Sequence, residues 1–242
     1  MKKNKTLPSL EDNATDQISL YTRMASGAFG PLGTLLSEVF LESLPNTLQK
    51  RLVTYVQILQ ERLTELEIKL DKHMLEDEEF IEVMRQGGLL ATGATTKERK
   101  EYIANIIANG LSREDVQMIE TKKILRTLDN VNDLEILLLC SYIDPTVNAI
   151  NEFKDQHPEL YEGMYITMAS STQEREKGAM RATYLENLCK ENLLSKEYST
   201  DITGNVEFDQ VTKSQKVRNH ILTVYGRLFL RRIGIQNERL NH

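Results

Sequence analysis

TTKERKEYIANIIANGLS, residues 95–112, carries the clearest helix signals in the chain. Thr95 and Glu98 have the spacing of a capping box, in which each side chain bonds to a free backbone N–H group at the helix start. Gly110 stands where a left-handed C-terminal cap is expected. One helical face is formed by Ile103, Ile106, Ile107 and Leu111. A face so rich in isoleucine must pack against other helices, so this stretch predicts a helical bundle.

Before this helix, apolar residues recur at alternating spacings of four and three, which is a heptad seam of about three repeats. The seam comprises Leu52, Val56, Leu59, Leu63, Leu66, Leu70 and His73. It predicts one long helix, capped by Asn46, that pairs with a neighbouring helix or with a second copy of the chain. Gly87-Gly88 and Gly93 are expected to break the apolar segment that follows the seam.

The N-terminal part of the chain offers a candidate face for a partner or a membrane surface. Residues 1–16 are polar and charged, which predicts a flexible tail. Gly30-Pro31 then indicates a helix start, and the apolar stripe around it comprises Phe29, Leu32, Leu35, Leu36, Val39 and Phe40. The alternative is that the stripe packs into the bundle, because Glu38 and Glu42 give little attraction to anionic lipid.

The chain changes character after the turn-forming residues 129–133. Asn132 and Glu135 are spaced to cap a short apolar helix. Asp144-Pro145 indicates the start of a second helix. A third helix is predicted over 172–190, with Met180 on its inner side. Two strand-like pieces and a last helix follow. This order is that of a winged-helix domain, so the predicted fold is mainly α: a bundle at 17–130 followed by a winged-helix-like α+β domain at 131–242.

Charge is divided unevenly along the sequence. The net charge is −6, yet residues 210–237 hold six basic residues and no acidic one. They form a candidate face for nucleic acid or an acidic partner: Lys213, Lys216, Arg218, Arg227, Arg231 and Arg232. Pairing within the molecule is the alternative. The third helix mixes basic with acidic residues, which weakens it as a reader of DNA.

The sequence contains no motif for catalysis, a cofactor or a metal. It has no GxxxxGK[ST], GxGxxG, HExxH or GxSxG pattern, so neither an enzyme nor a small-molecule substrate is expected. Cys140 and Cys189 lie in apolar patterns without metal spacing, which indicates buried thiols in a reducing compartment. The start MKKNK lacks a following apolar region. We therefore expect a location in the cytoplasm, or at the surface of the inner membrane.

Several segments together resemble the bacterial abortive-infection alpha-type proteins. They are GPLG at 30–33, YIANIIANGL at 102–111, LEILLL at 134–139, YLENLCKENLL at 184–194 and ILTVYGRLFLRRIG at 221–234. The chain departs from the family pattern in having no tryptophan in the central helix and Asn192 where a glycine is usual. The resemblance implies phage defence, with no catalytic residues to carry over. We expect the protein to act through protein–protein or membrane-surface binding, with self-association among the expected modes. The alternative is a winged-helix DNA-binding transcriptional regulator that uses the six basic residues.

Overall fold

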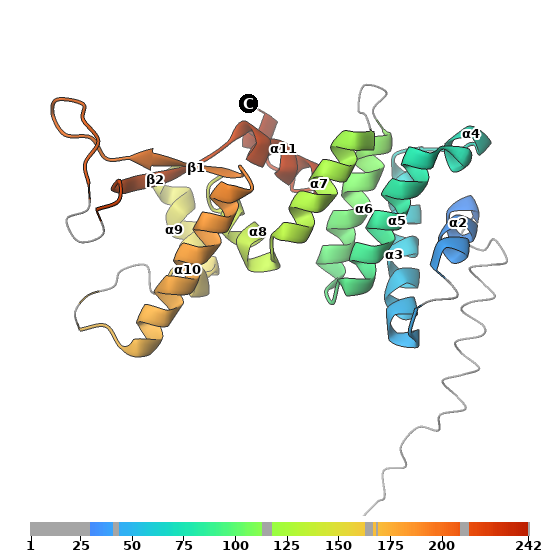
Figure 1. Ribbon diagram of the computed structural model, residues 1–242, viewed down its shortest axis with the longest axis horizontal. Coiled ribbons are helices and arrows are strands. Elements are labelled where there is room, and N and C mark those ends of the chain that lie inside the picture. The colour runs from blue at the N-terminus through green and yellow to red at the C-terminus, as the bar shows by residue number, and fades with distance from the viewer. Residues whose placement is uncertain are drawn as a thin grey trace, which may run out of the picture. The chain divides into compact units, whose positions relative to one another are not determined.

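The computed structural model describes residues 30–40, 44–112, 118–162, 167, 169–208 and 213–241 (Figure 1). It is mainly helical with a two-stranded antiparallel sheet, as the sequence predicts. The chain divides into two compact units, Met1–Leu125 and Arg126–His242. The division lies inside helix α7 (Met118–Asn130), a few residues before the predicted boundary. The predicted tail at 1–16 lies outside the described residues.

Unit 1 is a helical bundle centred on three helices that each pack on the other two: α3, α5 and α6 (Figure 1). Its elements are α2 (Gly30–Phe40), α3 (Asn46–Glu65), α4 (Lys72–Glu76), α5 (Glu78–Gly93), α6 (Lys97–Leu111) and the first turns of α7. The predicted isoleucine face of α6 lies in the core, where it buries Ile103, Ile106 and Ile107 together with Ala104 and Ala108. Leu111 is only half-buried.

Both ends of α6 differ in detail from the prediction. Thr96, not Thr95, caps the helix, and its Oγ1 accepts a hydrogen bond from the backbone N–H of Arg99 at 3.2 Å. Gly110 is not a left-handed cap but a residue inside the helix. A Cβ at Gly110 would lie 2.4 Å from Oγ1 of Thr121 on α7. Glycine therefore serves close packing of α6 on α7 at this position.

The prediction that Gly87-Gly88 breaks the helix is also wrong, because α5 continues through both residues to Gly93. A Cβ at Gly87 would lie 2.5 Å from Cδ1 of Ile107, and a Cβ at Gly88 would lie 2.5 Å from Cε2 of Phe40. The two glycines therefore bring α5 close to α6 and α2, and that packing outweighs their poor helix propensity.

The heptad seam forms a shorter helix than predicted. Its first four residues, Leu52, Val56, Leu59 and Leu63, are buried against α5 and α6 of the same chain. The helix then ends at Glu65, and Glu67 adopts a left-handed conformation with a φ of 54°. His73 is exposed on the separate helix α4. At the other end, Pro45 occupies the cap position that was predicted for Asn46.

Unit 2 has the predicted order of three helices, a hairpin and a helix. Its elements are the end of α7, α8 (Asp133–Cys140), α9 (Val147–Gln156), η1 (Pro158–Leu160), α10 (Thr172–Lys190), β1 (Leu194–Tyr198), β2 (Val217–Leu222), α11 (Val224–Arg232) and η2 (Glu238–Asn241). The predicted capping box of α8 is present: the N–H of Glu135 bonds to Asn132 Oδ1 at 2.9 Å, and the N–H of Asn132 to Glu135 Oε2 at 2.8 Å.

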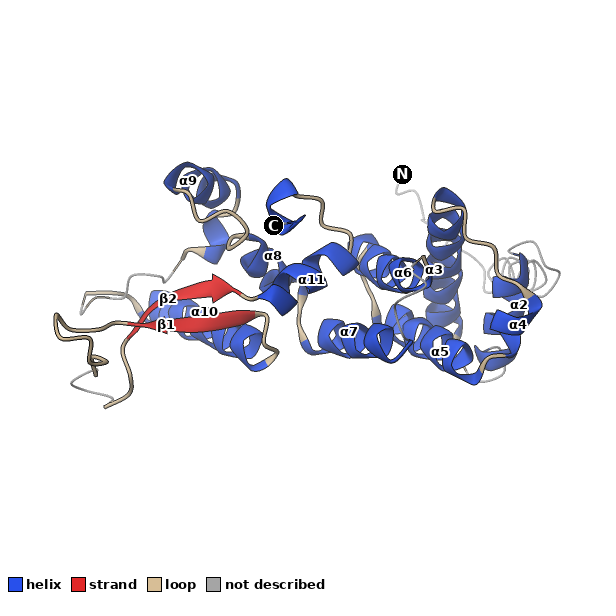
Figure 2. Cartoon of the chain, turned by 90° about the horizontal axis from the view of Figure 1, so that it is seen from above, coloured by secondary structure: helices blue, strands red, loops and turns tan. Residues whose placement is uncertain are grey.

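The two strands pair antiparallel, with Leu194 opposite Leu222 and Tyr198 opposite Val217 (Figure 2). Asn192 precedes β1 with a φ of 58°, a left-handed conformation that asparagine adopts more readily than most other residues with a side chain. The register shifts between Glu197 and Tyr198. Beyond this irregularity the chain makes two isolated antiparallel pairings, Thr200 with Val206 and Phe208 with Gln215. In Figure 2 this part projects past the ends of both strands.

Candidate interaction surface

The apolar stripe of α2 packs inside unit 1. Gly30 has a φ of 62°, a conformation that favours glycine, and the helix runs on from it. The stripe is buried at Leu32, Leu36 and Phe40 and half-buried at Leu35. Phe29 and the side chain of Val39 lie outside the described residues. The buried side chains are used within the bundle, so the expectation that this stripe binds a partner or a membrane surface needs correction.

The six basic residues do not form one exposed face. Arg232 is buried, with 7% of its surface exposed, and Arg227 is half-buried on the same helix. Lys216 forms an ion pair with Glu207 at 3.3 Å. The exposed remainder is divided between the hairpin, with Lys213 and Arg218, and α11, with Arg231. Part of the predicted set is therefore used within unit 2.

Three basic side chains of α10 are engaged by the segment that precedes this helix. Arg181 Nε donates to the backbone oxygen of Leu160 at 3.0 Å, and its guanidinium lies 5.9 Å from the centroid of the Tyr161 ring. Arg175 Nε donates to the backbone oxygen of Ser170 at 3.1 Å, and Lys177 forms an ion pair with Glu162. These contacts occupy basic side chains that a DNA-recognition helix would need for binding phosphates.

The most exposed apolar side chains of unit 2 include those of the hairpin tip, defined here as residues 198–208 and 213–217. Ile202 is wholly exposed at 105%, and Phe208 is 59% exposed. Tyr198 and Val217, paired at the base of the tip, are 37% and 38% exposed. Met180 on α10, predicted to face inward, is 50% exposed. Sequence reasoning missed Ile202, although an isoleucine inside the turn-forming run Asp-Ile-Thr-Gly-Asn is an unusual choice.

Hydrogen bonds fix the conformation of the hairpin tip. Asp201 Oδ1 accepts from the backbone N–H groups of Thr203 at 2.8 Å and Asn205 at 3.0 Å, and from the Thr203 hydroxyl at 2.6 Å. These bonds, led by the Thr203 hydroxyl, lower the pKa of Asp201. Below the turn, the N–H of Glu207 bonds to the oxygen of Ser199 at 2.8 Å. Ile202 is therefore presented beside a carboxylate on an ordered turn.

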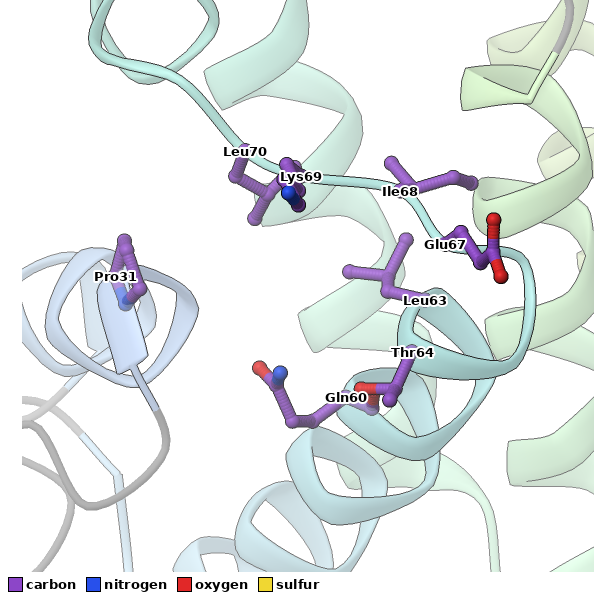
Figure 3. Close-up of a pocket in the computed structure, with 8 residues that line it drawn as sticks. All are labelled: Pro31, Gln60, Leu63, Thr64, Glu67, Ile68, Lys69 and Leu70. Carbon is purple, nitrogen blue, oxygen red and sulfur yellow. The ribbon is translucent and has the colours of Figure 1, made fainter.

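Unit 1 contains a pocket of about 800 Å³ between the start of α2, the end of α3 and the loop after α3 (Figure 3). Its lining is apolar at Pro31, Leu63, Ile68 and Leu70, and polar at Gln60, Thr64, Glu67 and Lys69. Figure 3 shows Pro31 facing the α3 residues across the pocket, with the loop residues along another side. The left-handed turn at Glu67 ends α3 and sends the loop along the pocket.

A half-buried histidine lies at the base of the hairpin. His220 is opposite Lys196 in the sheet, and its ring centroid is 6.3 Å from that of Tyr142, which follows α8. Burial, followed by the nearby charges of Lys196 and Arg181, lowers the pKa of His220, while Glu186 acts in the opposite direction. Burial also raises the pKa of Tyr142. The neutral imidazole is therefore the form that suits the folded unit.

Neither cysteine thiol is activated. Burial raises the pKa of Cys140 to about 12 and also raises that of Cys189. Since the thiolate is the nucleophile and the metal ligand, both groups are protonated and unreactive at neutral pH. No group of three or more metal-binding side chains occurs among the described residues. Within the same ranges, no helix has both the length and the apolar character needed to cross a membrane.

Comparisons of the chain with models of protein families, with curated proteins and with solved structures found no match.

Proposed function

We propose that this chain is a non-enzymatic protein of the abortive-infection alpha type, which protects bacteria against phage by binding another protein through its hairpin tip. The observation that carries the proposal is the exposure of Ile202 on the ordered turn that Asp201 holds, with the exposed Phe208 at the nearby pairing with Gln215. Apolar side chains gain free energy when they leave water, and a preformed turn loses little conformational entropy on binding. The hairpin tip thus has the properties of a protein-binding element.

A protein partner fits the tip better than lipid or nucleic acid does. Asp201 lies next to the exposed Ile202, and its pKa is lowered, so its carboxylate is charged at neutral pH. An anionic headgroup or a phosphate would be repelled by this charge at the apex. Ile202 and Phe208 also offer little to a phosphate backbone, whose binding depends on Lys and Arg. Of the two lysines in the tip, Lys216 is paired with Glu207, and Lys213 is exposed.

A phage challenge with a plasmid-borne gene tests this function. We expect the wild-type protein to lower the efficiency of plating, and Ile202→Asp to abolish that protection, because a charge replaces the exposed apolar contact. Ile119→Asp is the matched control, since Ile119 on α7 is also exposed, at 60%. Wild-type protein that gives no protection would rule out the defence role. Equal protection by Ile202→Asp and the control would rule out the role of the tip.

A DNA-binding regulator is the second candidate, favoured by the exposure of Lys213, Arg218 and Arg231 on a unit with winged-helix order. Gel-shift titration with duplex DNA over a salt series tests it. A regulator would bind at physiological salt and lose affinity steeply as salt rises. Replacing the three residues by glutamate would then abolish the shift. Undetectable binding of wild-type protein at physiological salt would remove this candidate.

A further inference from the structure

We infer that the partner of the hairpin tip is a second copy of this chain, and that the tip of one copy enters the α2–α3 pocket of the next. The inference rests on the proposed protein-binding role of the tip and identifies its partner. Two features of the chain are complementary: a projecting turn that exposes Ile202, and a pocket of about 800 Å³ of which half of the lining residues are apolar.

The dimensions of the two features match. Pockets of about 300–1,000 Å³ accommodate ligands of drug size, so this pocket has room for an isoleucine side chain and part of its turn. Leu63, at 2% exposure, provides an apolar floor, and Pro31 lies opposite α3 (Figure 3). Burying Ile202 there would remove its apolar surface from water without any change in the fold of the turn.

The charges are also compatible. The tip carries the Asp201 carboxylate beside Ile202, and Lys69 lines the pocket. Lys69 is exposed, and within the described part of the chain it forms no ion pair. A tip seated in the pocket could therefore place Asp201 near an available ammonium group. Glu67 lies on the same rim and would oppose a carboxylate, which favours an orientation of the tip toward Lys69.

Such a contact is heterologous, because the tip and the pocket are different surfaces of the chain. Head-to-tail contacts of this kind give closed rings or open filaments, whereas a self-complementary contact gives a dimer. A contact limited to one turn and one pocket would bury little surface, so we expect a weak and transient association. We therefore expect assemblies larger than a dimer that grow with protein concentration.

Light scattering coupled to size-exclusion chromatography tests this inference on the full chain, from about 5 to 500 μM, a range chosen for weak association. We expect the mass to rise with concentration for wild-type protein and for Ile119→Asp. Ile202→Asp removes the tip contact and Thr64→Trp fills the pocket at an exposed position. Each variant should weaken association by about tenfold or more and remain monomeric over this range. Far-UV circular dichroism should show that both variants are folded.

Mixing the two variants provides the decisive test. An Ile202→Asp copy retains its pocket and a Thr64→Trp copy retains its tip, so the mixture should form a one-to-one dimer that cannot grow. A wild-type protein that is monomeric at all concentrations overturns the inference, as does a dimer that neither variant affects. Association lost only in Ile202→Asp would show that the tip binds another surface. Phage protection that depends on Ile202 in a monomeric protein would overturn this inference and leave the proposed function standing.

Discussion

Replacing Gly226 by alanine is expected to destabilise unit 2. Gly226 lies in the first turn of α11, and a Cβ there would lie 2.3 Å from the backbone oxygen of Leu193 and 2.8 Å from Leu222 Cδ1. The Leu193 oxygen is held in place because it accepts hydrogen bonds from the N–H and the hydroxyl of Thr223, both at 3.1 Å. A methyl group therefore forces backbone to move and strains the junction between β1 and α11.

The magnitude follows from opposing effects. Overpacking a tight site costs about 1–3 kcal/mol, and the upper half of that range applies because the opposing atom belongs to the backbone. A weakened hydrogen bond at Thr223 adds about 1 kcal/mol. Alanine gains about 1 kcal/mol over glycine inside a helix. The expected net loss is about 2–3 kcal/mol, or roughly 8–12 °C in the unfolding midpoint of a unit of this size.

Thermal unfolding followed by calorimetry measures this loss, and amide hydrogen exchange assigns it to a unit. Exchange should accelerate in α11 and β1 of the Gly226→Ala protein and stay unchanged in α5. Gly93→Ala is the control: nothing lies within 4 Å of a Cβ at Gly93, so its stability should equal or exceed that of the wild type. A wild-type midpoint for Gly226→Ala, with unchanged exchange at β1, would refute the packing argument.

Three further predictions concern buried groups. The hydroxyl of Tyr55 is buried with no hydrogen-bond partner among the described residues. Tyr55→Phe should therefore leave the melting temperature unchanged or raise it, with a gain in stability of up to about 1 kcal/mol. A clear decrease in the melting temperature would show that the hydroxyl has a partner. The pKa of His220 in the folded protein lies below its value of about 6.5 in the unfolded chain. The neutral imidazole therefore contributes to the stability of unit 2 above pH 6.5. This contribution is lost as the pH falls from 6.5 toward the folded-state pKa. Urea titrations from pH 8 to 5 should show that His220→Gln flattens this loss, and an unchanged pH dependence in His220→Gln would contradict the role of its burial. Leu36→Asp should unfold unit 1, as judged by circular dichroism, because it buries an unpaired charge; a folded variant would contradict the packing of α2.

Local signals in the sequence predicted the elements well. The capping box of Asn132 and Glu135 and the isoleucine face of α6 depend on neighbours within a few residues, and both are present. The same reasoning placed the cap of α6 one residue early, at Thr95 instead of Thr96, because Glu98 has capping-box spacing from Thr95 whereas Thr96 has Arg99 at that spacing.

The errors arose where a residue's role depends on a distant part of the chain. In the sequence, three glycines resemble helix-breaking or helix-ending residues, but each allows two helices to approach closely: Gly87, Gly88 and Gly110. The heptad seam suggested a longer helix because Leu66 and Leu70 continue its spacing, yet the left-handed Glu67 ends α3 before them. The spacing of apolar residues in the sequence indicates which residues can share one face of a helix. It contains no information about where a neighbouring helix stops supporting that face.

The candidate interaction surface also separates what local sequence signals predict from what long-range packing decides. By itself the sequence determined the mainly helical class, the order of elements and the uneven charge, since these depend on periodicity, capping and composition. Only the tertiary structure decided which side chains remain available. It buried Leu36 and Arg232 and exposed Ile202 and Phe208, because exposure depends on what the rest of the chain places over a side chain. Residues far apart in the sequence provide that cover, and a local pattern cannot specify them.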